Sequence, residues 1–140
     1  AEKTPLPDAP TADAEHLPAD WRTRLPAQLD ALVTAWRDPA AWEGMTEAGG
    51  VRMPAGAIGL VALNEVLVHG WDLAVATGQG YRADPASAEA CLQFAAGVAA
   101  DAPEGREGLF GPPVPVPDDA PVLHRLLGLT GRDPGWTPVR

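Results

Sequence analysis

Apolar residues recur at intervals of three and four along much of this sequence, which is the spacing of one face of an α-helix. The first such stretch runs from about Asp20 to Trp36, and its regularly spaced apolar residues are Leu25, Leu29, Leu32, Val33 and Trp36. Pro26 lacks an N–H donor and its ring clashes with the preceding turn, so we expect this helix to begin near Pro26 or to kink there. The pair Asp38-Pro39 should end it.

The longest predicted helix runs from about Ala55 to Thr77, and Gly78 is placed to end it in the left-handed conformation. Apolar side chains surround this stretch on almost every side. They are Ile58, Leu60, Val61, Leu63, Val66, Leu67, Val68, Trp71, Leu73 and Val75. A helix that is apolar nearly all round is typical of the centre of a bundle rather than of its surface.

A further helix is predicted from Asp84 to about Ala102, because Asp84 is a favourable N-cap and Pro85 suits the first helical position. The segment from Phe110 to Pro117 follows. Proline recurs in it so often that it can form neither a helix nor a ladder-paired strand.

A short last helix is expected near the end of the sequence. Asp118 and Asp119 should cap its N-terminus, because carboxylates accept hydrogen bonds from the first N–H groups of a helix. It should extend to about Leu129, and Gly131 should close it.

Between the first and second helices, the pattern favours two short strands. Residues 42–46 and 51–53 flank Gly49-Gly50, and two glycines can supply the positive φ of a tight turn. Pro54 then suits the first turn of the following helix. The sequence therefore predicts a mainly α-helical fold with one short β-hairpin.

Charge and cysteine content narrow the possible partners. With 19 acidic and 10 basic side chains in 140 residues, the chain carries a net charge of −9 and should repel phosphate backbones and anionic lipid headgroups. We therefore expect neither nucleic acid nor a membrane as a partner. Cys91 is the only cysteine, which excludes an internal disulfide and a thiolate metal cluster.

The distribution of polar residues bears on domains and location. Residues 1–18 hold four prolines and no apolar period, which predicts a proline-rich arm or linker, and residues 19–140 are expected to form the helical domain. Polar and charged residues interrupt the apolar run from Ala55 to Ala76, which argues against a membrane-spanning helix. No secretory signal pattern is present, so a cytoplasmic location is expected.

Three polar residues of the long helix could carry chemistry. Glu65 and His69 lie four apart, so both side chains can reach one ion, and a carboxylate oxygen and an imidazole nitrogen are good ligands for zinc and similar metals. Asp72 lies three beyond His69 and could orient the imidazole from the second shell or add a ligand.

Simpler interpretations remain open. Glu65, His69 and Asp72 could form only the solvated face of the helix, because an i, i+4 pair of Glu and His is frequent. His16 and His124 are candidates for a further ligand, although each also fits a solvated surface histidine. Cys91 lies in an alanine-rich stretch and fits a small buried apolar residue better than a nucleophile.

Two separated motifs carry a family resemblance. Residues 64–74 read NEVLVHGWDLA and residues 76–79 read ATGQ, which resembles the signature of actinobacterial DinB-like metal-binding proteins. These are similar to the N-terminal domain of mycothiol-dependent maleylpyruvate isomerase. Residues 110–121 and 131–134 resemble the C-terminal end of the same group, so the match covers about residues 19–135.

The resemblance implies a DinB-like up-and-down helical bundle and a divalent metal held by Glu65 and His69. Zinc is the first expectation, and nickel or another transition metal is the alternative. The family places a further histidine ligand on an earlier helix, one of two helices that precede the segment beginning near Asp20. The chain is therefore expected to correspond to the C-terminal portion of such a domain.

Two functions follow as hypotheses. In relatives of known activity the metal activates a small thiol, which implies a metalloenzyme of transferase or isomerase type with mycothiol as cosubstrate and a small-molecule substrate. The alternative is a non-catalytic module that binds metal or another protein. A homodimer is also possible, since exposed apolar surface favours association.

Overall fold

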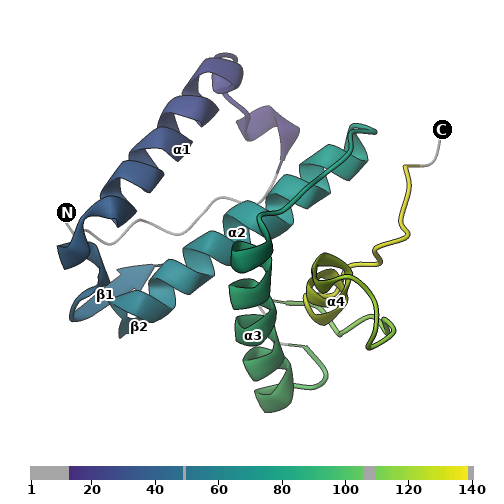
Figure 1. The fold of residues 1–140 in the computed structure, drawn as a ribbon. Helices are drawn as coiled ribbons and strands as arrows, with labels where there is room; N and C mark the ends of the chain where they lie inside the picture. Colours follow the sequence, from purple (N-terminus) through teal and green to yellow (C-terminus); the bar gives the residue numbers. More distant parts are fainter. Residues whose placement is uncertain (1–12, 49, 106–109, 139–140) are drawn as a thin grey trace. The chain divides into compact units, whose positions relative to one another are not determined.

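The computed structural model describes residues 13–48, 50–105 and 110–138. Contacts divide the chain into two units, Ala1–Gly59 and Leu60–Arg140, with the boundary inside the longest helix. The described part is mainly helical with one two-stranded antiparallel sheet, which confirms the fold class at this level (Figure 1). The prediction of a proline-rich arm over residues 1–18 falls mostly outside the described residues; within it, Ala14–His16 forms one 3₁₀ turn.

The first unit opens with helix α1 (Trp21–Arg37), which ends directly before Asp38 as predicted. The helix starts at Trp21, one residue after the predicted Asp20, and continues through Pro26. Of the two alternatives at the proline, a helix that begins there is therefore wrong. None of its residues is buried, and the predicted apolar face is exposed at Leu25, Leu29 and Val33.

A 3₁₀ turn (Pro39–Trp42) follows α1 and brings two tryptophans together. The rings of Trp36 and Trp42 meet edge to face with their centroids 4.8 Å apart, and the indole Nε1 of Trp42 donates to the carbonyl of Trp36 over 2.8 Å. Gly59 lies beneath them: a Cβ at this position would come within 2.6 Å of the Trp42 ring. The glycine therefore allows the tryptophan pair to lie against the first turns of the following helix.

The predicted hairpin is present as β1 (Met45–Ala48) and β2 (Val51–Pro54), paired antiparallel with Ala48 opposite Val51. Its bounds differ from the expectation in three places: β1 begins at Met45 and ends at Ala48 instead of spanning residues 42–46, and β2 extends one residue further. Trp42 belongs to the 3₁₀ turn instead of the first strand, and Pro54 ends β2 instead of opening the next helix. Proline is tolerated at the end of a strand in a two-stranded sheet, since its missing N–H breaks no inner ladder.

Helix α2 (Ala55–Ala76) matches the prediction almost to the residue. Gly78, at φ +70°, closes it: its N–H bonds the carbonyl of Val75, and the N–H of Gln79 bonds the carbonyl of Ala74. These two bonds form the Schellman arrangement that satisfies the last carbonyls of a helix.

By length and composition α2 is also able to span a membrane, with a mean hydropathy of 1.4. Central helices of water-soluble proteins are often equally long and apolar, so these two properties are weak evidence for a membrane span. The expectation that no membrane partner exists stays a prediction.

Helix α3 (Pro85–Asp101) begins as the sequence indicates. The Asp84 carboxylate accepts hydrogen bonds from the backbone N–H and the hydroxyl of Ser87, both over 2.9 Å. These bonds stabilise the ionised form and lower the pKa of Asp84 below its usual value.

Helix α4 (Val122–Leu129) ends as expected but does not begin as expected. Pro121 occupies the N-cap, so the prediction that Asp118 and Asp119 cap this helix is wrong. A turn in which the N–H of Ala120 bonds the carbonyl of Pro117 separates the two carboxylates from the helix start. Residues 111–117 form neither helix nor strand, as their prolines predicted, whereas Phe110, the first residue of the predicted segment, forms a single β-bridge.

The core of the second unit lies where α2, α3 and α4 meet. Its buried members are Leu67, Val68, Ala88, Cys91, Leu92, Ala95, Phe110 and Leu126. Cys91 is fully buried, which confirms its interpretation as a small apolar core residue, and burial raises the pKa of its thiol. The hydroxyl of Tyr81 donates to the carbonyl of Leu67 over 2.8 Å and ties the segment before α3 to α2.

Gly128 allows the proline-rich segment to pack closely on α4. A Cβ at this position would lie 2.5 Å from a methyl of Val116 and 2.7 Å from the carbonyl oxygen of Val114. The N–H of Val114 donates to the carbonyl of Gly128 over 2.9 Å. The close approach is therefore fixed by a backbone contact that cannot move aside as a flexible side chain could.

Replacing Gly128 by alanine should destabilise the fold by about 1–3 kcal/mol, because the added methyl overlaps this backbone. Gly97 on α3 is the matched control, since a Cβ there would meet nothing within 4 Å. Gly97→Ala should stabilise by about 0.5–1 kcal/mol through helix propensity. Urea unfolding followed by circular dichroism measures both changes, and equal effects of the two substitutions would contradict the close packing at Gly128.

The Asp84 cap predicts a pH dependence of stability. Since the folded state lowers the pKa of Asp84, the carboxylate contributes stability above its unfolded pKa, and this contribution is lost as the pH falls through the folded pKa. Asn caps a helix as well as Asp does but does not titrate. The advantage of the parent over Asp84→Asn in urea unfolding should therefore shrink between neutral pH and about pH 3. A constant difference would show that the charge of Asp84 adds nothing to the cap.

Candidate functional site

One face of α2 brings together the three polar residues that the sequence singled out. The Glu65 Oε2 atom lies 3.1 Å from His69 Nε2, and the Asp72 Oδ2 atom lies 2.9 Å from His69 Nδ1. The imidazole therefore has a carboxylate at each of its nitrogens. This follows from the helix repeat, since residues three and four apart share a face.

Arg132, just beyond α4, completes the group. Its Nη2 donates to Asp72 Oδ2 over 3.0 Å and its Nε donates to Oδ1 over 3.3 Å, so the guanidinium grips both carboxylate oxygens. Its Nη1 also donates to the carbonyl of Thr130 over 2.7 Å. This fork holds the Asp72 carboxylate in one orientation.

The end of α4 places Arg132 in position. Gly131 has φ +80°, its N–H bonds the carbonyl of Gly128, and the N–H of Arg132 bonds the carbonyl of Leu127. This is a second Schellman arrangement, and it turns the chain back so that the Arg132 side chain reaches α2. The predicted role of Gly131 in closing the helix is confirmed.

Burial and charge act on Asp72 in opposite directions. Partial burial alone would raise its pKa, but the hydrogen bonds from Arg132 and His69, with the attraction of both groups, lower the pKa below its usual value. Asp72 is therefore held as an ionised carboxylate, which accepts hydrogen bonds from N–H groups.

The four side chains differ in their access to solvent. The exposed fraction is 61% for the His69 side chain and 47% for that of Glu65, but 35% for Asp72 and 23% for Arg132. The Asp72–Arg132 pair is thus the anchored part of the group, and the Glu65–His69 pair is open to a solute.

This geometry fits two chemical states. A neutral imidazole that donates from Nδ1 to Asp72 keeps a lone pair on Nε2, on the side of Glu65, where a metal ion can bind. Two ligands about 2.0–2.1 Å from a tetrahedral zinc ion lie about 3.3 Å apart, close to the observed separation of Nε2 and Oε2. A protonated imidazole would instead form ion pairs with both carboxylates.

The other candidate ligands of the second unit, His124 and Cys91, do not join this group. His124 is exposed on α4, and His16 belongs to the 3₁₀ turn of the first unit. Cys91 lies in the core. Across residues 13–48, 50–105 and 110–138, no three or more His, Cys, Asp or Glu side chains are gathered where they could hold one metal ion.

A hollow of about 340 Å³ adjoins the anchored end of the group. Trp71, Val75 and Trp136 line it together with Asp72 and Arg132. It offers aromatic walls and a charged edge, which suits a small organic molecule.

Sequence reasoning missed Arg132. The signal available was Gly131, since the residue after a left-handed glycine cap departs sharply from the helix axis. The partner of Arg132 could not be inferred, because Asp72 lies 60 residues away in the chain.

Comparison with known proteins adds no relative: no family model, curated protein or solved structure matches the chain.

The fork between Arg132 and Asp72 predicts an energetic coupling. In a double-mutant cycle of Asp72→Asn and Arg132→Gln, the interaction term in urea unfolding should be about 1 kcal/mol, because the pair is bidentate and partly buried. Effects that add within about 0.3 kcal/mol would show that the fork contributes nothing to stability.

Proposed function

We propose that this chain is a DinB-like divalent-metal protein in which Glu65 and His69 bind the ion and Asp72 positions the imidazole. The observation that carries the proposal is the imidazole between two carboxylates, with Asp72 at Nδ1 and Glu65 at Nε2. The resemblance of residues 64–79 supports the same assignment. Zinc is the proposed metal, with nickel or another transition metal as alternatives.

In this proposal each residue has a distinct part. Arg132 holds the Asp72 carboxylate, and Asp72 accepts a hydrogen bond from Nδ1–H of His69. The lone pair of Nε2 is then the one that binds the metal. Glu65 supplies an oxygen on the same side. The resemblance implies a further histidine from an earlier helix of an up-and-down bundle, and this stays part of the proposal.

For the reaction, we propose thiol chemistry of transferase or isomerase type, with mycothiol as cosubstrate and a small electrophile as substrate. A bound divalent cation lowers the pKa of a coordinating thiol, and the thiolate is the nucleophile. The hollow lined by Trp71 and Trp136 is where the chain's own residues would orient the organic part. A cytoplasmic location, where such thiols stay reduced, belongs to the same proposal.

The alternative is a non-catalytic metal-binding or protein-interaction module. The observation that favours it is the direct Glu65–His69 pair, which satisfies both side chains without an ion. The exposed apolar residues Val66 and Leu73 on the same helix also suit a protein partner or a second copy.

Metal titration separates a metal site from a simple ion pair. Calorimetric titration with Zn²⁺ should give one ion per chain. His69→Ala and Glu65→Gln should each weaken binding by more than about 100-fold, and Asp72→Asn by about 10- to 100-fold through loss of imidazole orientation. His124→Ala is the matched control, because this exposed histidine lies outside the group, and it should leave binding unchanged.

Equal affinity in the parent and His69→Ala would overturn the metal site and leave the interaction module as the function. If Zn²⁺ binds as proposed, a panel of electrophiles with mycothiol then decides between enzyme and module. Thiol consumption that requires both Zn²⁺ and His69 supports the enzyme; metal binding without thiol consumption supports the module.

A further inference from the structure

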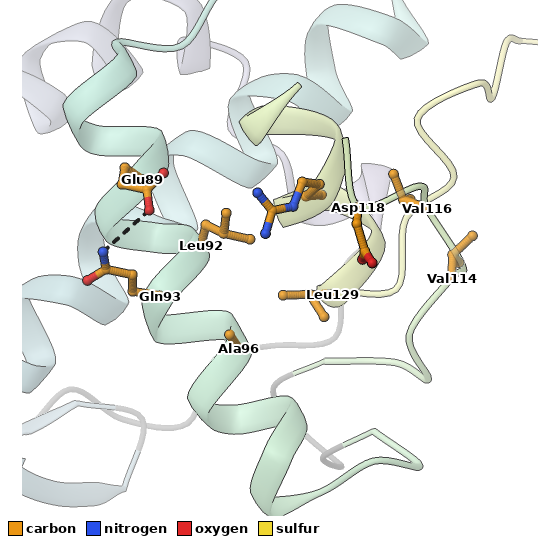
Figure 2. A pocket seen from close by; sticks show the side chains of 9 residues that line it. Glu89, Leu92, Gln93, Ala96, Val114, Val116, Asp118 and Leu129 are labelled. Carbon is orange, nitrogen blue, oxygen red and sulfur yellow. Dashed lines mark hydrogen bonds between the residues drawn. The ribbon is translucent and has the colours of Figure 1, made fainter. Parts of the chain in front are cut away.

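A second cavity, of about 290 Å³, lies in the second unit and involves none of the residues of the proposed metal site. Three segments line it: α3, the proline-rich segment and the turn before α4, and α4 itself (Figure 2). Its volume is at the lower end of the range for small-molecule sites, roughly 300–1,000 Å³. It therefore suits a ligand of few heavy atoms.

Part of the lining of this cavity is apolar. Figure 2 shows Leu92 of α3 and Leu129 of α4 pointing into the space between the two helices. Val114 and Val116 of the proline-rich segment also line it, and the close packing at Gly128 holds both near α4. This surface would accept an aliphatic side chain and remove it from water.

Charges of both signs line the same cavity. Arg125 of α4 faces it and is only partly exposed, and the acidic side chains are Glu89 of α3 and Asp118 of the turn before α4. Within the described residues, neither Arg125 nor Asp118 has a hydrogen bond or ion-pair partner. Glu89 accepts one long hydrogen bond, 3.4 Å, from the amide of Gln93 through Oε1, and its Oε2 atom can still accept one from a ligand.

This arrangement discriminates between classes of ligand. A purely apolar molecule would cover Arg125 and the two carboxylates without pairing them, which is costly. A dianion would be repelled by Glu89 and Asp118, and a simple cation would be repelled by Arg125. A molecule with one carboxylate, one ammonium group and an aliphatic part pairs both signs and fills the apolar surface.

We propose that this cavity binds a small zwitterion with an aliphatic side chain, that is, a free apolar amino acid or a dipeptide. The carboxylate of the ligand pairs with Arg125, its ammonium group pairs with Glu89 or Asp118, and its side chain lies against Leu92 and Leu129. Arg offers a planar pair of donors that matches a carboxylate. The site is independent of the metal and of the proposed thiol chemistry.

Amide NMR spectra of the ¹⁵N-labelled chain test the proposal directly. L-leucine and L-leucyl-L-leucine, added to about 10 mM, should shift the signals of Ala96 and Leu129, with dissociation constants near the millimolar range. N-acetyl-L-leucine lacks the ammonium group and L-leucinamide lacks the carboxylate. Each should bind about tenfold more weakly than leucine, because one charged hydrogen-bond partner is lost.

Two pairs of variants locate the binding. Arg125→Gln should weaken leucine binding about tenfold, whereas Arg82→Gln, which removes an exposed arginine outside the cavity, should not. Ala96→Leu should block the cavity, whereas Ala100→Leu, at an exposed position one turn further along α3, should not.

The proposal is overturned if neither leucine nor leucyl-leucine shifts the signals of Ala96 and Leu129. It is also overturned if N-acetyl-L-leucine and L-leucinamide bind as tightly as leucine. Should Arg125→Gln fail to fold, the ligand series and the Ala96→Leu and Ala100→Leu pair decide the question on their own. Loss of the proposed metal function would leave each of these outcomes unchanged.

Discussion

The fork between Arg132 and Asp72 is the contact on which the geometry of the candidate site depends. It joins the segment after α4 to the C-terminal half of α2, and the two residues are 60 positions apart in the sequence. Because the guanidinium holds both oxygens of Asp72, that carboxylate faces His69 Nδ1 in a fixed orientation. The other nitrogen of the ring is then left on the side of Glu65. Without Arg132, Glu65 and His69 would still be neighbours on a helix, but the ring would lack its anchor.

Helix α4 is only eight residues long, but it positions side chains of both proposed sites. Leu126 and Leu127 are fully buried and fix the helix in the core. From that position Arg125 and Leu129 face the cavity toward α3, and the turn at Gly131 sends Arg132 toward α2. One well-packed helix thus positions both proposed sites, which is how a rigid element can support side chains of separate function.

Local chemistry explains why several elements could be predicted from the sequence. The bounds of α2 and α3 follow from apolar composition, from the Asp84 cap and from the Gly78 closure, each of which acts within one turn of the helix. The sharing of one face by Glu65, His69 and Asp72 follows from the helix repeat in the same way. The start of α1 near Asp20 followed from the same apolar spacing, and the helix continues through Pro26 although a proline inside a helix costs about 3 kcal/mol.

By itself, then, the sequence determined the helices and the stripe of polar residues on α2, because these depend on neighbours no more than about four residues apart. It also determined the hairpin, whose paired residues lie no more than nine apart. Only the tertiary structure decided that Arg132 meets Asp72, that Asp118 and Asp119 do not cap α4, and that Arg125 shares a cavity with Glu89. Each of those outcomes depends on how α3, the proline-rich segment and α4 pack around one core. Side-chain volume and backbone approach, as at Gly128, govern that packing, and neither can be read from periodicity along the chain.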